Sequence, residues 1–120
     1  MSVSFALLDA IQNDFIVPAH VSDRLHITLA ELALTLGISR DSVTKTARLQ
    51  SKATQARLRE MLEILNRTEP WTGSLLGAYA WYRSQGLASF GDATAETLVR
   101  QGRGNDVRSY LERVAAGGFA

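Results

Sequence analysis

The sequence contains no cysteine, and only two prolines and two histidines occur among its 120 residues. The absence of cysteine excludes disulfide bonds, thiolate zinc sites and cysteine nucleophiles. His20 and His26 are the only imidazoles. For two isolated histidines we expect surface or capping roles rather than metal ligation. The sequence therefore predicts no metal site and no cofactor.

Long hydrophobic runs are also missing from the chain. No apolar stretch approaches the roughly 20 residues that a helix needs to cross a bilayer. The segment MSVSFALLDAIQND lacks the basic region of a signal peptide. We therefore expect a cytoplasmic protein without membrane contact. The composition, 46% hydrophobic and 21% charged, is typical of a folded globular chain.

Patterns that would indicate catalysis are absent as well. Carboxylates are scattered singly, mostly near basic residues at helical spacing, as with Arg59 and Glu63. No G-x-S-x-G nucleophile turn occurs, and the glycines after residue 100 are placed like helix ends rather than like a phosphate-binding loop. We therefore expect a binding protein and not an enzyme.

The most informative segment is residues 29–49, LAELALTLGISRDSVTKTARL. Ala33, Gly37 and Val43 follow the A-x3-G-x5-V spacing of a helix-turn-helix. A small residue at Ala33 allows two helices to approach closely, and glycine at position 37 can adopt a positive φ without a steric penalty. Val43 would then be buried on the second helix. The spacing predicts two short helices joined by a tight turn.

Flanking residues agree with this interpretation. Thr28 and Glu31 form a capping-box pattern at the start of the first helix, and Ser39 is placed to cap the second. Ile38 is expected to enter the core. On the second helix we expect inward-facing side chains at Val43 and Ala47, with Thr46 or Leu49 as further candidates.

Basic charge is concentrated over the second helix, although the whole chain carries only +1. Residues 40–59 contain six basic side chains and a single acidic one, Asp41. Because a helix-turn-helix places its second helix in the major groove, this segment predicts DNA binding. The candidate contact residues are Ser39, Arg40, Thr44, Lys45 and Arg48. The alternative is a purely structural pair of helices, since this spacing also occurs in all-α domains that do not bind DNA.

Pro18 and Pro70 divide the chain, because proline interrupts helices and biases the preceding residue toward extended geometry. We expect a short helix over residues 4–15 and a loop or extended link over 16–27. The predicted regions are a DNA-binding region at 1–50, a connecting or dimerisation helix at 51–67, and a helical domain at 68–120.

The helix predicted over 51–67 carries a narrow apolar stripe at i, i+3, i+4 and i+7 spacing. Its members are Leu58, Met61, Leu62 and Leu65. The stripe fits a dimer seam and a core face equally well. What favours the seam is that helix-turn-helix proteins usually bind paired half-sites as two-fold dimers, so we expect a homodimer.

The segment after Pro70 is rich in aromatic residues and predicts three further helices, at about 74–85, 95–101 and 105–116. Thr94 and Asn105 are candidate caps. Glycines at 86, 102 and 117 are candidate helix stops. The predicted fold class is all-α, with a helix-turn-helix unit followed by a small helical lobe.

Residues 90–120, FGDATAETLVRQGRGNDVRSYLERVAAGGFA, carry a set of motifs that points to a known family. Their shared features are a glycine before a Thr-capped helix, a Leu-Val pair before a glycine, a Val-x3-Leu helix and a glycine-rich tail. The residues concerned are Gly91, Thr94, Ala95, Glu96, Leu98, Val99, Gly102, Val107 and Leu111. This segment resembles the C-terminal toxin-binding domain of the Xre/MbcA/ParS-like antitoxins, and the resemblance extends over residues 55–120.

The resemblance implies an antitoxin that neutralises a RES-domain toxin, an NAD-degrading or ADP-ribosylating enzyme, by obstructing its NAD pocket. It also implies that operator DNA of the shared operon is a second partner. Two positions depart from the commoner pattern. Ala95 stands where many members have proline, and Thr46 stands where many helix-turn-helices have a larger apolar residue.

The tail supports a toxin contact physically, because it combines two glycines with one large aromatic side chain and no charged side chain after Arg113. The alternative for this tail is a frayed terminus. The candidate toxin-binding residues are Trp81, Leu111, Arg113, Gly117, Gly118, Phe119 and Ala120. The alternative function for the chain is a stand-alone transcriptional regulator whose C-terminal lobe dimerises or senses a ligand.

Overall fold

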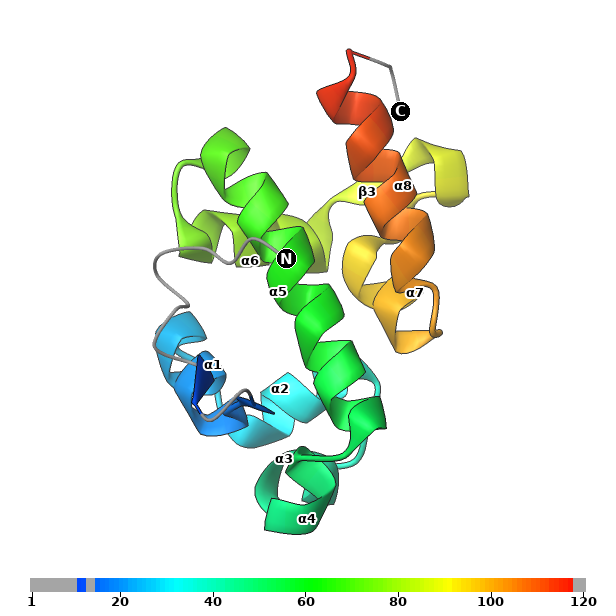
Figure 1. The fold of residues 1–120 in the computed structure, drawn as a ribbon. Coiled ribbons are helices and arrows are strands. Elements are labelled where there is room, and N and C mark those ends of the chain that lie inside the picture. The colour runs from blue at the N-terminus through cyan, green and yellow to red at the C-terminus, as the bar shows by residue number, and fades with distance from the viewer. Residues whose placement is uncertain (1–10, 13–14, 118–120) are drawn as a thin grey trace.

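The computed structural model describes residues 11–12 and 15–117 and is mostly helical there (Figure 1). The long helix α5 runs through the middle, with α1 to α4 grouped at its N-terminal end and α7 and α8 along another side (Figure 1). The helices are α1 Pro18–Leu25, α2 Leu29–Leu36, α3 Asp41–Thr44, α4 Thr46–Leu49, α5 Lys52–Thr72, α6 Leu75–Ser84, α7 Ala95–Arg100 and α8 Gly104–Ala115. Two antiparallel hairpins pair β1 Ile11–Gln12 with β2 Phe15–Ile16, and β3 Gly86–Leu87 with β4 Ala93–Thr94. A 3-10 turn covers Ala88–Phe90 between the last two strands.

The core is built on the apolar stripe of α5. Leu58, Met61, Leu62 and Leu65 are each 0% exposed within a single chain. Of the two alternatives for this stripe, a dimer seam and a core face, the core face is therefore correct, because the chain itself covers all four side chains. Buried residues of α1 to α3 and of α6 to α8 pack into the same cluster, so both halves of the chain share one hydrophobic core.

The expected helix over 4–15 and link over 16–27 are both wrong where the structure describes them. Residues 11–12 and 15–16 form the hairpin β1–β2, and the rest of the 4–15 segment lies outside the described residues. The segment 18–25 is the helix α1. Pro18 begins this helix rather than blocking one, because the first helical position needs no N–H donor.

One buried side chain, Gln55 of α5, attaches the hairpin to the helical core. Its Oε1 accepts a 2.8 Å hydrogen bond from the Ile16 N–H, and its Nε2 donates to the Ile16 carbonyl at 2.9 Å. The same Nε2 also donates to the Leu49 carbonyl at the end of α4, at 2.7 Å. The amide thus satisfies the polar backbone of a two-residue strand that is too short to hold its place alone.

The turn between α2 and α3 has the expected geometry. The Thr28 hydroxyl accepts a 3.0 Å hydrogen bond from the Glu31 N–H, and Gly37 ends α2 with φ of 72°. The N–H of the half-buried Ile38 donates to the Ala33 carbonyl at 3.1 Å, which completes the glycine-based helix stop. Ala33 and Val43 are each 2% exposed, as the A-x3-G-x5-V spacing predicts.

The second helix of this pair is interrupted, contrary to expectation. Lys45 is extended, with φ of −81° and ψ of 124°, and it separates α3 from α4. Thr46 and Ala47 are consequently exposed and the prediction that they face inward is wrong, while Leu49 is half-buried. Local sequence favours the break, because Val43, Thr44 and Thr46 are β-branched and the Thr44 hydroxyl donates to the Arg40 carbonyl at 3.1 Å.

The C-terminal helices lie close to their expected positions, with two corrections. α5 continues through Pro70 to Thr72 instead of ending near residue 67, and Gly73 stops it with φ of 88°. Asn105 does not cap α8, which begins one residue earlier, at Gly104. A Cβ at Gly104 would meet the Glu60 carboxylate, so a larger residue there would make the Glu60 side chain move. Thr94 does cap α7, its hydroxyl accepting a 3.1 Å hydrogen bond from the Thr97 N–H.

The core position of Leu62 leads to a stability prediction. Leu62→Ala should lower the free energy of unfolding by about 2 to 5 kcal/mol, because it leaves a cavity among buried side chains. Leu34→Ala is the matched control, since Leu34 is 53% exposed and should change stability by no more than about 0.5 kcal/mol. Urea unfolding followed by circular dichroism measures both. Equal stability of the two variants would contradict the placement of Leu62 in the core.

Candidate nucleic-acid interface

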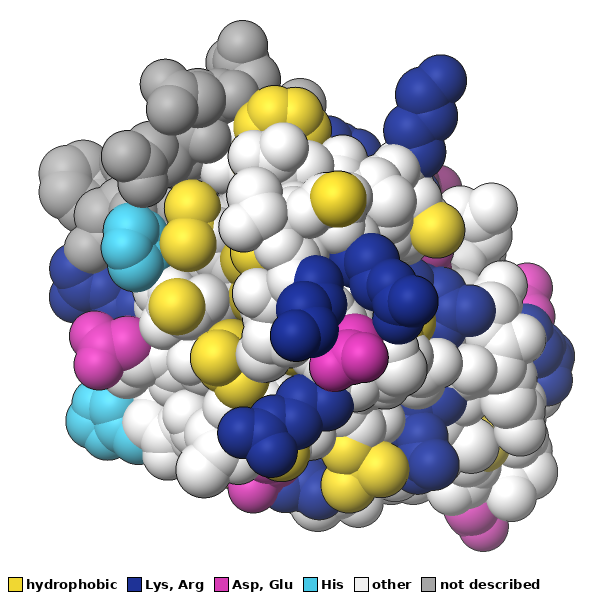
Figure 2. Space-filling model, turned by 90° about the horizontal axis from the view of Figure 1, so that it is seen from below, with side chains coloured by type: hydrophobic (Ala, Val, Ile, Leu, Met, Phe, Trp, Pro, Cys, Tyr) yellow, Lys and Arg dark blue, Asp and Glu magenta, His cyan; other side chains and the backbone are white. Residues whose placement is uncertain are grey.

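The five residues predicted to contact DNA all lie on the surface around α3 and α4. Ser39 and Arg40 lead into α3, Thr44 ends it, Lys45 forms the break, and Arg48 lies on α4; each is exposed. Seen from the α3–α4 end, the molecule presents several Lys and Arg side chains with few acidic ones among them (Figure 2). The sequence therefore placed these residues on one end of the molecule correctly, although the helix that carries them is broken.

The basic side chains of this surface are weakly neutralised. Asp41 lies 3.8 Å from the Arg48 guanidinium, but the two side chains are 57% and 63% exposed, so water screens the pair. Within the described part of the chain, Arg40 and Lys45 form no ion pair. The surface keeps most of its positive charge for an anionic partner.

Arg57 is one of the six basic residues in the segment 40–59, but its side chain has a structural role. Its Nη1 donates to the Leu36 carbonyl at 2.7 Å and to the Val99 carbonyl at 2.8 Å. These carbonyls end α2 and α7, whose negative dipole ends therefore meet at one guanidinium. Sequence proximity to Arg48 gave no hint of this role, because its partners are 21 and 42 positions away. Arg57 is not available for phosphate contacts.

A second polar network joins the first helix of the candidate motif to the C-terminal half. Glu31 Oε2 accepts a 2.9 Å hydrogen bond from the Tyr79 hydroxyl and lies 3.1 Å from Nη1 of Arg83. Nε of Arg83 donates to Glu96 at 2.8 Å. Glu31 therefore faces α6 instead of returning to the backbone of Thr28, so only half of the predicted capping box forms.

Tyr82 extends this connection into the core. Its hydroxyl donates to the Thr35 carbonyl at 3.1 Å, and burial raises the pKa of the phenol well above its usual range. The raised pKa favours the protonated phenol, which is the form that donates this hydrogen bond. The aromatic residues after Pro70 thus serve the core, at Tyr82, and the link to α2, at Tyr79.

The predicted toxin-binding residues are not all accessible. Leu111 is 1% exposed and packs in the core, so its assignment to a partner surface is wrong. Trp81 is half-buried against the same core. Arg113 is exposed, with its guanidinium 5.9 Å from the Tyr110 ring centre, and Gly117 is exposed with φ of 86°. Gly118, Phe119 and Ala120 lie outside the described residues.

Two other site classes find no counterpart among the residues that the structure covers. Over that part of the chain, no cluster of three or more His, Asp or Glu side chains is arranged to hold a metal ion. No helix in the described ranges has the length and apolar character needed to cross a membrane. Comparison of the chain with protein-family models, with curated proteins and with solved structures found no match.

The position of Arg57 between two helix ends leads to a second prediction. Arg57→Met should lower the free energy of unfolding by about 2 kcal/mol, because it leaves two carbonyls without their charged donor. Arg59→Met, on the exposed side of the same helix, is the control and should have a small effect. Thermal or urea unfolding measures the difference. Indistinguishable variants would show that the Arg57 hydrogen bonds contribute nothing net.

Proposed function

We propose that the chain is an antitoxin of the RES-Xre type. In this proposal α2 and α3 form a DNA-binding helix-turn-helix, and the C-terminal end binds and neutralises a RES-domain toxin by obstructing its NAD pocket. The protein acts in the cytoplasm as a homodimer that also represses its own operon.

The observation that carries the DNA-binding half is the geometry at Gly37. Ala33 and Val43 are buried, Gly37 makes the left-handed turn, and the opposite surface presents Arg40 and Lys45 to solvent with no ion pair to a described acidic residue. A structural helix pair has no need for this concentration of charge. DNA phosphates are its most natural complement.

The toxin-binding half is supported by the resemblance of residues 55–120 to the antitoxin domain and by the exposed end of α8. Because Leu111 is buried, we place the contact on Arg113, Gly117 and the residues beyond, and we give Trp81 a supporting role. Among the residues that the structure describes, the last one in the core is Leu111, so a partner could contact the exposed end of α8 without displacing a described core side chain.

The proposed homodimer cannot use the stripe of α5, because that stripe is fully covered. A second copy would need another surface. Three large apolar side chains remain exposed in the described part of the chain: Leu34, Trp71 and Leu76.

A stand-alone transcriptional regulator is the second candidate. The single shared core favours it, because a C-terminal half that packs directly on α2 behaves as part of one DNA-binding domain rather than as a separate partner-binding lobe. Co-expression with the adjacent open reading frame, followed by co-purification, separates the two: an antitoxin retains the neighbouring RES-domain protein, whereas a regulator does not.

The DNA-binding proposal predicts distinct effects for two substitutions. If Arg40 contacts a base, Arg40→Ala should reduce the free energy of DNA binding by about 1 to 3 kcal/mol and relax the sequence preference. Lys45→Ala should weaken binding to all DNA sequences alike and lower the slope of log affinity against log salt concentration by roughly one. Arg113→Ala removes the same charge from the end of α8 and is the control. Fluorescence anisotropy with a duplex from the upstream region, and with a scrambled duplex, measures both effects.

Unchanged DNA affinity in both Arg40→Ala and Lys45→Ala would contradict the proposal that the surface around α3 and α4 contacts DNA. A loss as large in Arg113→Ala as in Lys45→Ala would show that only the total charge matters.

The toxin proposal predicts the effect of deleting residues 118–120. The variant should keep its melting temperature and DNA affinity, because Leu111 is the last core residue in the described part of the chain and α8 ends at Ala115. It should protect cells less well against the toxin, since burial of Phe119 against the toxin would contribute about 1.5 to 3 kcal/mol to the free energy of toxin binding. Growth and cellular NAD are measured at matched expression. Equal protection by the full-length and shortened proteins would show that this tail takes no part in neutralisation.

A further inference from the structure

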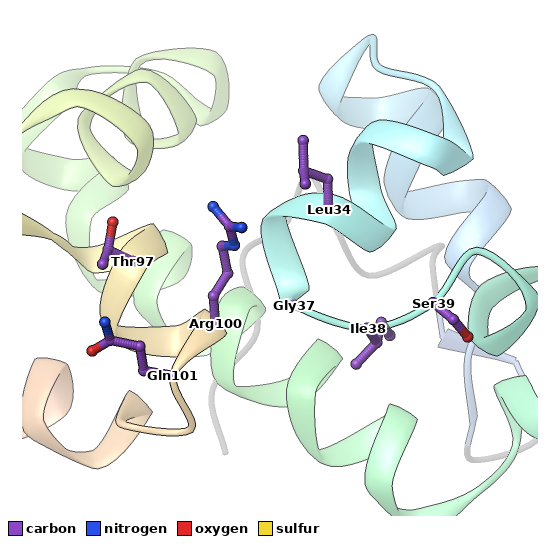
Figure 3. Close-up of a pocket in the computed structure, with 7 residues that line it drawn as sticks. All are labelled: Leu34, Gly37, Ile38, Ser39, Thr97, Arg100 and Gln101. Carbon is purple, nitrogen blue, oxygen red and sulfur yellow. The ribbon is translucent and has the colours of Figure 1, made fainter.

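A groove of about 570 Å³ separates the α2–α3 turn from α7. One wall is formed by Leu34, Gly37, Ile38 and Ser39, and the other by Thr97, Arg100 and Gln101. Arg100 extends from α7 into the space between the two walls, while Ser39 lies at the far end of the α2–α3 turn (Figure 3). The groove therefore borders the segment that leads directly into Arg40.

The charge of this groove is positive. Arg100 is 45% exposed, and its only ion pair in the described structure is a long one, 3.9 Å to Glu96. Glu96 is already paired at 2.8 Å with Arg83. None of the described residues that line the groove is acidic, so the Arg100 guanidinium faces it largely uncompensated.

Hydroxyl groups on both walls add hydrogen-bonding capacity. The Thr97 hydroxyl accepts a 3.0 Å hydrogen bond from Thr94, which leaves its own proton free to donate. The Ser39 hydroxyl accepts from the Ser42 N–H at 3.3 Å and shares a 2.9 Å contact with the Ser42 hydroxyl, in which either oxygen can be the donor. The two hydroxyls lie on opposite walls, apart from the guanidinium between them (Figure 3), so the group best suited to a phosphate here is Arg100.

The two walls are held in register by backbone contacts. A Cβ on Gly37 would lie 2.8 Å from the Arg100 Cα and 2.9 Å from its carbonyl oxygen, so the backbone segments at Gly37 and Arg100 are in direct contact. The hydrogen bonds of Arg57 to Leu36 and Val99 fix the same junction from the core side. Arg100 is thus positioned relative to Ser39 and Arg40 before any ligand binds.

We infer that this groove binds a backbone phosphate of DNA, so that α7 contributes a clamp beside the proposed reading surface. This inference rests on the proposed DNA-binding function and extends it to a residue of the C-terminal half. Arg100 is the charged contact, because its guanidinium extends into the groove between the two walls (Figure 3). Leu34 and Ile38 give the groove an apolar side that the sugar of the same nucleotide can cover.

The test compares Arg100→Ala with Arg113→Ala, which removes an equally charged side chain from the distal end of α8. Anisotropy titrations use the upstream duplex and a scrambled duplex of equal length, over a range of chloride concentrations in phosphate-free buffer. Arg100→Ala should weaken binding to both duplexes roughly five- to tenfold at 0.1 M salt and lower the salt exponent by about 0.9. Arg113→Ala should leave both quantities unchanged.

Arg100→Gln is a second variant, because the amide removes the charge while keeping a polar side chain. A thermal melt of each variant checks that it is folded. The inference is overturned if folded Arg100 variants bind DNA like the wild type while Lys45→Ala is weakened; the proposed function then stands without the clamp. If Lys45→Ala and Arg40→Ala are also unaffected, the proposed function itself fails. Loss of toxin co-purification in Arg100→Ala with normal DNA binding would assign the groove to a protein partner instead.

Discussion

The guanidinium of Arg57 is the contact on which the arrangement of the two halves depends. Two helices end at the same place, and without a cation their carbonyl groups would face each other across a partly buried junction. By binding Leu36 and Val99 together, Arg57 sets the distance between α2 and α7. The approach of Gly37 to the Arg100 backbone and the opening of the groove both follow from that distance.

Local signals in the sequence predicted the helix ends well. Thr28, Gly37 and Thr94 act through hydrogen bonds or backbone angles within a few residues, so their roles can be read without knowing the fold. The proline pattern does not predict α1, because proline interrupts a helix in its interior but is favoured at its first position, where Pro18 stands. The extended conformation of Lys45 was missed because the helical spacing of Val43 and Ala47 suggested one continuous helix.

The residues of the candidate site likewise differ in whether local sequence or the tertiary fold determines their role. Exposure of Arg40 and Lys45 followed from amphipathic spacing, which is a local property. The role of Arg57 could not be predicted, because it depends on carbonyl groups that only the tertiary fold brings together. The burial of Leu111 has a related explanation, since a residue that matches a family motif can serve packing as readily as binding.

The single core has a consequence for how this architecture can be recombined. Leu32 and Leu36 of α2 are covered by elements that follow residue 50, and Gln55 completes the hydrogen bonds of β2. A fragment ending at residue 50 would therefore expose apolar surface and lose the anchor of its own hairpin. A chimera that joins residues 15–50 to a different C-terminal segment must therefore include α5, because α5 supplies both the core side chains and Gln55.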